Sequence, residues 1–191
     1  MNRTTFLIVM TVGSAAAILA QEPAPTPLAE FGLNASLLNS HPGNDVQSFS
    51  APGGSATVVY NFTRAFGAVA DLGGYHNGAD VNFNPTTFTY LFGPRISLRH
   101  SRLTPYAQAL FGGARQWTSF ADPVSGLTSP PNSGFAAAYG GGLDIRVKDH
   151  LLIKPFQVDY LMTRVVNPLS TTNNQNNIRF SAGVVFTIGS K

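Results

Sequence analysis

The chain has 191 residues and a net charge of +3, and it contains 19 Gly and 14 Phe but no Cys. Only 11% of the residues are charged, which is less than half of the usual fraction in a soluble domain, and the many Gly and aromatic residues favour strands and turns. The length fits one domain, the lack of Cys excludes disulfide bonds, and the scattered basic residues exclude a nucleic-acid-binding surface.

Residues 1–20 have the layout of a secretory signal peptide. Arg3 precedes an apolar run that passes into small residues and ends at Ala20, where we expect cleavage. The alternative is a retained membrane anchor, but roughly 15 apolar residues fall short of the about 20 that a spanning helix needs. Residues 21–27 have Pro at every second position near their end, which predicts an extended periplasmic lead-in. No later stretch is long and apolar enough for a membrane helix, so a membrane location requires residues 28–191 to form a closed barrel.

Eight segments with apolar and polar residues in alternation make up the rest of the chain. Most of them are long enough for a tilted membrane strand, which needs roughly 9–11 residues, whereas strands of soluble proteins usually have about 5–6. The segments are 28–38, 55–63, 65–76, 86–98, 102–116, 134–147, 151–164 and 176–188.

The connections between these segments alternate between short and long. Short turns are expected at Arg64, at residues 99–101 and at residues 148–150. Outer-membrane barrels have this asymmetry, with short periplasmic turns and longer extracellular loops. We therefore predict an all-β fold, namely an eight-stranded antiparallel up-and-down transmembrane β-barrel with both termini in the periplasm. The long connections, all rich in turn-forming residues, are 39–54, 77–85, 118–133 and 165–175.

Each segment has one apolar face and one face of small residues with an occasional charge. In residues 86–98, Phe88 and Phe92 share the apolar face and Arg95 lies on the other. The alternative is a secreted, soluble calycin-like barrel that binds a small apolar ligand, but its water-facing side would carry many Lys and Glu residues. The charges here are few and of both signs, so we expect lipid against the apolar face and a salt-bridged interior. The predicted interior charges are Asp71, Arg95, Asp144, Arg146, Asp159 and Arg179.

Two prolines interrupt the alternation near the short turns, Pro105 and Pro155. Proline within a sheet is found at bulges or strand ends, so we expect bulges at both positions.

Two pairs of a His and an Asp, in or beside the first two long connections, are candidates for catalytic residues. They are His41 with Asp45 and His76 with Asp80. A His beside a carboxylate is the raw material of a general base. No Ser is placed as a nucleophile, however, so we predict that the chain is not an enzyme, with a lipid-modifying enzyme of the outer membrane as the alternative. The other two His residues lie in turns on the opposite side, so we expect neither a metal site nor a cofactor.

The last segment resembles the terminal strand by which outer-membrane barrels are recognised by their assembly machinery. That signal has a polar residue, a Gly and two hydrophobic residues at fixed spacing, and Ser181, Gly183, Phe186 and Ile188 fill it in order. Trp117 follows the fifth segment and is the candidate for an aromatic girdle at the membrane interface.

The chain after the lead-in resembles the family of small eight-stranded barrels typified by the OmpA transmembrane domain and the opacity-type adhesins. Residues 106–108, 140–144 and 155–160 are similar to strand patterns of that family. The resemblance implies an exported protein of the bacterial outer membrane that contacts lipid and lipopolysaccharide and is inserted by the barrel assembly machinery; we further expect a monomer.

A barrel of eight strands is just wide enough to be filled by its own side chains. We therefore predict a closed lumen without a general pore, with a small-solute channel as the alternative. The expected role is envelope integrity or surface adhesion, carried by the four long connections.

Overall fold

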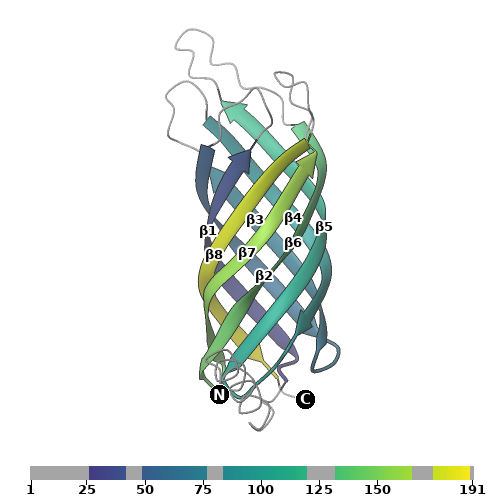
Figure 1. Ribbon diagram of the computed structural model, residues 1–191, viewed down its shortest axis with the longest axis vertical. Coiled ribbons are helices and arrows are strands. Elements are labelled where there is room, and N and C mark those ends of the chain that lie inside the picture. Colours follow the sequence, from purple (N-terminus) through teal and green to yellow (C-terminus); the bar gives the residue numbers. More distant parts are fainter. Residues whose placement is uncertain (1–25, 42–48, 77–83, 120–131, 165–173, 190–191) are drawn as a thin grey trace, which may run out of the picture.

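The structure, a computed structural model, describes residues 26–41, 49–76, 84–119, 132–164 and 174–189, and within these ranges eight antiparallel strands form a closed barrel (Figure 1). The predicted fold class is therefore confirmed. No helix in the described ranges is long and apolar enough to cross a membrane. The predicted signal peptide and most of the lead-in lie outside the described residues. The strands are β1 (Ala29–His41), β2 (Phe49–Asn61), β3 (Phe66–His76), β4 (Asn84–Ser97), β5 (Leu103–Ser119), β6 (Asn132–Lys148), β7 (Leu151–Arg164) and β8 (Asn174–Ile188).

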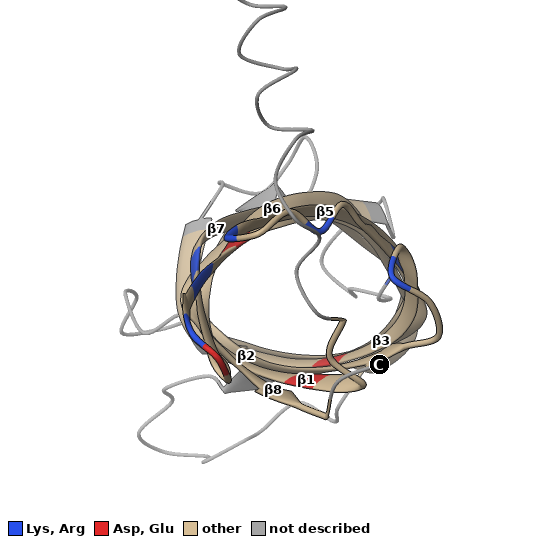
Figure 2. Cartoon of the chain, turned by 90° about the horizontal axis from the view of Figure 1, so that it is seen from below, with Lys and Arg blue, Asp and Glu red and all other residues tan. Residues whose placement is uncertain are grey.

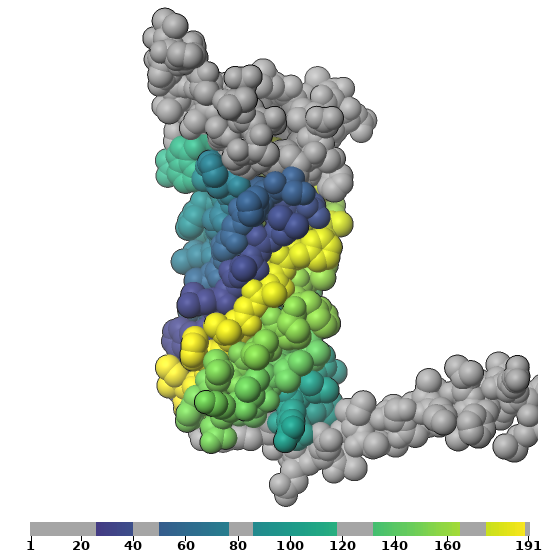
Figure 3. All heavy atoms as spheres, turned by 90° about the vertical axis from the view of Figure 1, so that its left-hand side faces the viewer, coloured from purple at the N-terminus to yellow at the C-terminus, as the bar shows by residue number. Residues whose placement is uncertain are grey.

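Each strand pairs with the next one along the chain, and β8 pairs with β1 to close the ring. Ala29 of β1 lies opposite both Tyr60 of β2 and Ile188 of β8. This end of the barrel, which we call the short-turn end, also holds the three short connections, and it is at the bottom of Figure 1 and towards the viewer in Figure 2. The other end is the long-connection end. Figure 3 shows β8 running diagonally across the outer wall between β1 and β7.

The first two strands extend further than the sequence predicts. A connection is expected over residues 39–54, yet the ladder between β1 and β2 runs on through Ser36 opposite Gly53 and Leu38 opposite Ala51. Pro52 fits into β2 because the pairing of β2 with β3 begins only at Gly53, so Pro52 has no partner strand on that side. The turn-forming residues here lie within a strand because its neighbours hold it extended.

The alternation resolves into an apolar outer wall and a mostly polar interior. Phe92 is 54% exposed, whereas its neighbour Leu91 is 0% and Arg95 only 3% exposed. A soluble barrel would bury such a wall, so this arrangement argues against the calycin-like alternative. One exposed apolar residue from each strand illustrates the wall: Phe31, Val58, Leu72, Phe92, Phe111, Phe135, Phe156 and Phe180.

A bulge lies in β7 at Pro155 and Phe156, where the register with β8 shifts between Lys154 and Gln157. It confirms the bulge predicted from Pro155. The bulge predicted at Pro105 is wrong, because Pro105 pairs with Leu143 without a register shift. Proline is tolerated there because the ladder between β4 and β5 ends at Tyr106, the next residue along β5. The Pro105 carbonyl still accepts a bond from the Leu98 backbone amide at 2.9 Å.

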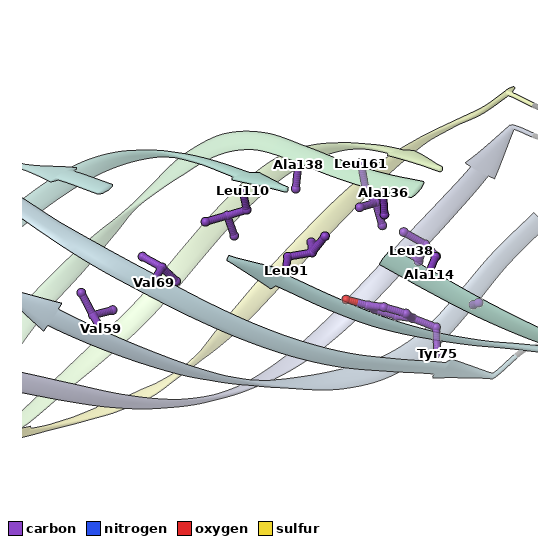
Figure 4. Close-up of a cluster of buried hydrophobic side chains, with 11 residues drawn as sticks. Leu38, Val59, Val69, Tyr75, Leu91, Leu110, Ala114, Ala136, Ala138 and Leu161 are labelled. Carbon is purple, nitrogen blue, oxygen red and sulfur yellow. The ribbon is translucent and has the colours of Figure 1, made fainter. Parts of the chain in front are cut away.

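The interior has an apolar layer towards the long-connection end (Figure 4). Leu38, Tyr75 and Leu161 lie close to the ends of β1, β3 and β7 on that side. Leu91 and Leu110 are both fully buried in the same cluster. Val59 and Val69 extend the cluster towards the short-turn end, where most other interior side chains are polar and form the site described next.

Candidate functional site

Arg179 of β8 joins opposite walls of the barrel. Its guanidinium donates to Asp71 of β3 at 2.7 Å, to Asp159 of β7 at 2.8 and 2.9 Å, and to the Tyr75 hydroxyl at 3.0 Å. In a ring of eight strands β3 and β7 face each other, so these contacts cross the lumen. Arg179 and both carboxylates are 0% exposed.

A second group of ion pairs lies nearer the short-turn end. Arg95 of β4 donates to Asp144 of β6 at 2.6 Å, and its Nη1 lies 4.0 Å from Glu30 of β1. Arg99, which follows β4, pairs with the same Glu30. Asn61 of β2 donates to Glu30 at 2.8 Å and accepts from Arg99 at 2.9 Å. Residues from four strands thus converge on one buried carboxylate and its partners.

Tyr106, Lys154 and Gln157 connect the two groups. The Arg95 guanidinium stacks 3.5 Å from the centroid of the Tyr106 ring. The Gln157 side-chain oxygen accepts from the Tyr106 hydroxyl at 2.7 Å and from the Lys154 ammonium at 2.9 Å. Gln157 in turn donates to Asp159 at 2.7 Å. Polar contacts therefore run without interruption from Arg99 to Asp71.

The bulge in β7 makes this connection possible. Lys154 and Gln157 are three residues apart and would face opposite sides of a regular strand. Both are 2% exposed, whereas Pro155 and Phe156 between them lie on the outer wall. The extra residue of the bulge thus turns the Lys154 side chain inwards to meet Gln157.

The charges of the described interior balance. Burying an isolated charge is costly unless an opposite charge and hydrogen bonds compensate it. The buried acidic residues are Glu30, Asp71, Asp144 and Asp159, and the buried basic residues are Arg95, Arg99, Lys154 and Arg179. Four negative and four positive groups therefore leave this part of the interior neutral.

The structure brings five of the six predicted interior charges into these contacts, and Arg146 is the exception. Arg146 is half-exposed near the short-turn end, where its Nη1 donates to the Asp149 backbone carbonyl at 3.2 Å. The pairing of β6 with β7 shifts register between Leu143 and Ile145 and again between Arg146 and Lys148, so strict alternation does not hold there.

Sequence reasoning missed Glu30, Arg99, Lys154 and Tyr106 as members of the network. Glu30 shares a face with Asn34 and Ser36, all three of which are buried, so alternation along β1 carries the signal that could have revealed it. Lys154 is different, because alternation places it with Phe156 on the outer wall and only the bulge reverses it.

The other predicted residues lie apart from the ion pairs. In β8, Ser181 faces the interior and Phe186 and Ile188 lie on the outer wall; their recognition by the assembly machinery stays a prediction. Trp117 is half-buried near the long-connection end of β5, with the Arg115 guanidinium 5.5 Å from its ring centroid. Its role in an aromatic girdle also stays a prediction.

The candidate catalytic pairs fall partly outside the described residues, so they stay untested. The exposed His76 has its Nδ1 2.8 Å from the Thr86 hydroxyl, and both Asp45 and Asp80 lie outside the described ranges. The His41 side chain is likewise not described. In the described part of the chain, no group of three His, Asp or Glu residues could hold a metal ion.

Comparisons with known proteins bear on the architecture. No protein-family model matches the chain, and no curated protein matches its sequence. Among solved structures, neisserial surface protein A is similar with a TM-score of 0.64 and 14% identity, over 84% of this chain and 97% of that one. Ail, the attachment invasion locus protein of Yersinia pestis, has a TM-score of 0.56 and 15% identity, over 85% and 98%. The outer membrane protein OprG from Pseudomonas aeruginosa has a TM-score of 0.52 and 11% identity, over 88% and 99%.

At such low identities the likeness concerns the fold alone. It confirms the resemblance to small outer-membrane barrels that the strand patterns predict.

Proposed function

We propose that the chain is a non-enzymatic β-barrel of the bacterial outer membrane whose lumen is closed and whose role is exerted at the long-connection end. The observation that carries this proposal is the charge-balanced network that spans the interior from β3 to β7 and β8. Such an interior holds the strands of the barrel wall together, and it leaves no path for solutes through the lumen.

The outer wall supports the membrane location. Every strand presents large apolar side chains outwards, as a lipid-facing band requires, while the buried acidic and basic groups of the described interior are equal in number. The short-turn end would face the periplasm and the long-connection end the cell exterior, following the asymmetry of outer-membrane barrels. Export by a signal peptide, insertion by the assembly machinery through β8 and a monomeric state belong to the same proposal.

Closure of the lumen follows from how its layers are filled. A solute moving along the axis would have to pass Leu91 and Leu110, which are fully buried, and then separate Arg179 from Asp71. Separating a buried ion pair leaves both charges in a medium of low dielectric, where each is strongly destabilised. We therefore expect no large, stable single-channel conductance from the purified protein in planar bilayers.

Surface interaction is the role we favour for the long-connection end. Four connections join the strands at that end, and the network holds these strands in place. Ail, a protein of the same fold, is by its name an attachment protein and has been crystallised with the heparin analogue sucrose octasulfate. Adhesion or an envelope role through these connections is thus consistent with the fold, with lipopolysaccharide as the surrounding lipid.

Cysteine labelling tests the orientation, because the chain has no Cys of its own. We expect a membrane-impermeant maleimide to label S125C, in the third long connection, on intact cells. The matched variant S101C, in the short turn between β4 and β5, should react only after the outer membrane is permeabilised. Labelling of S101C on intact cells, or a protein that shows no heat-dependent shift in SDS gels, would overturn the proposal.

Binding of labelled heparin then tests the surface role. Cells that express the protein should retain more heparin than cells that lack it. Equal retention by both would remove the support that the comparison with Ail lends.

A further inference from the structure

A pocket lined by basic side chains lies at the short-turn end, outside the ion-pair network. Its volume is about 520 Å³. It lies where the turn between β4 and β5 meets the end of β6, and the backbone bond from the Arg146 amide to the Arg102 carbonyl, at 2.8 Å, joins these two elements. The lining residues are Ser101, Arg102, Arg146, Val147, Lys148 and Asp149.

The pocket carries an excess of positive charge. Arg102, Arg146 and Lys148 supply three cations and Asp149 supplies one carboxylate, so the net charge of the lining is +2. Arg102 and Lys148 are exposed, which leaves their long side chains able to reach an anion. Arg146 is held in the pocket by its bond to the Asp149 carbonyl, at 3.2 Å. Guanidinium and ammonium groups in this arrangement suit a phosphate.

The same pocket borders the apolar outer wall. Val147, one of its lining residues, is 52% exposed, and Leu103, the first residue of β5, is 41% exposed. A ligand that fills the pocket would therefore have an anionic head against the three basic residues and an apolar tail against the wall. A free phosphate would use only the first of these two surfaces.

We propose that this pocket binds the phosphate of an anionic phospholipid in the membrane leaflet that borders the short turns. The proposal rests on the membrane orientation given above. Phosphatidylglycerol fits because its headgroup carries a net negative charge, and basic residues at a membrane surface attract such lipids. Phosphatidylcholine has the same phosphate, but its choline cation faces a lining of net charge +2 and offsets the attraction.

Native mass spectrometry of the refolded protein, released from detergent with added lipid, tests this site. We expect the wild type to retain phosphatidylglycerol in preference to phosphatidylcholine with the same acyl chains. The R102Q/K148Q variant should lose this preference, with retention falling roughly 25-fold, because each basic residue near a membrane surface contributes about fivefold to binding. The matched control is R115Q/R164Q, which removes two exposed Arg residues at the long-connection end.

The outcomes separate the site from its alternatives. Equal loss in R115Q/R164Q would overturn the proposal, since it would assign binding to overall positive charge. Equal retention of the two lipids by the wild type would also overturn it. Complete competition by inorganic phosphate, without added benefit from the acyl chains, would replace the lipid with a free anion. The heat-dependent shift is read on the same samples and cysteine labelling on cells that express the S125C and S101C variants, so failure of lipid binding in a folded and correctly oriented barrel counts against this pocket only.

Discussion

Replacing Arg179 with Met should cause the largest loss of stability of any single substitution in the interior. The side chain is 0% exposed and donates to Asp71, Asp159 and Tyr75 at once. Met keeps an unbranched apolar side chain but is shorter and carries no charge, so R179M leaves two carboxylates buried without their cation. Breaking a buried ion pair by removing one partner costs about 3–5 kcal/mol, and we expect R179M to lower the free energy of unfolding by about this amount.

The two carboxylates do not depend on Arg179 equally. Asp159 still accepts from Gln108 at 3.2 Å and from Gln157 at 2.7 Å. Asp71 has no comparable amide donor among the described contacts, so most of the loss should arise there. The double variant R179M/D71N, which removes that charge, should therefore recover about half of the lost stability.

Urea unfolding of the protein in lipid vesicles measures these changes. The chain has one Trp, and the fluorescence of the half-buried Trp117 should change as the barrel unfolds and its side chain becomes exposed to water. The control is R164M, which changes an exposed Arg at the end of β7 and should shift stability by less than about 1 kcal/mol. The reasoning is refuted if R179M stays within about 1 kcal/mol of the wild type, or if D71N gives no recovery in the double variant.

Two further changes test the bulge and the packing between strands. Deletion of Pro155 would remove the extra residue of the bulge and place Lys154 and Gln157 two residues apart, on the same inward face of a regular strand. The fraction of protein that shows the heat-dependent gel shift should therefore stay close to that of the wild type, and a large fall would show that the bulge itself is required. G93A should lower the free energy of unfolding in urea by about 1–3 kcal/mol, because the added methyl group would overlap the Ala109 backbone carbonyl. The matched control is G74A, whose added carbon has nothing within 4 Å. Similar effects of the two substitutions would contradict the described packing.

Local alternation predicts much of this barrel but not its contacts. The period of two assigns Asp71, Arg95 and Arg179 to the interior because each lies on a regular strand. It could not assign Arg179 to Asp71, since the two are 108 residues apart in the sequence and meet only across the closed ring. Where a strand is irregular, as around Lys154 and Arg146, the face of a side chain depends on the ladder with its neighbour and the prediction is wrong or incomplete.

The same limit applies to the strand ends. Gly53 and Gly54 predict a turn from their own conformational freedom, but the pairing of β1 with β2 extends through both. Pairing with the neighbouring strand keeps these residues extended, and the composition of a short stretch of sequence carries no information about that pairing.

Pairing of every buried carboxylate with a nearby cation is a property of the complete barrel only. The strands from β3 to β7, with Arg99 after β4, contribute Asp71, Asp144 and Asp159 against Arg95, Arg99 and Lys154, while β1 brings Glu30 and β8 brings Arg179. An intermediate without these two outer strands would have its charges balanced in number but misplaced, with Asp71 far from any cation that could bind it. When β1 pairs with β8, the ion pairs of Glu30 and Arg179 therefore form in the same step as the hydrogen bonds that close the ring. Folding should consequently be all-or-none, because no partly closed barrel shares the stability of the closed one.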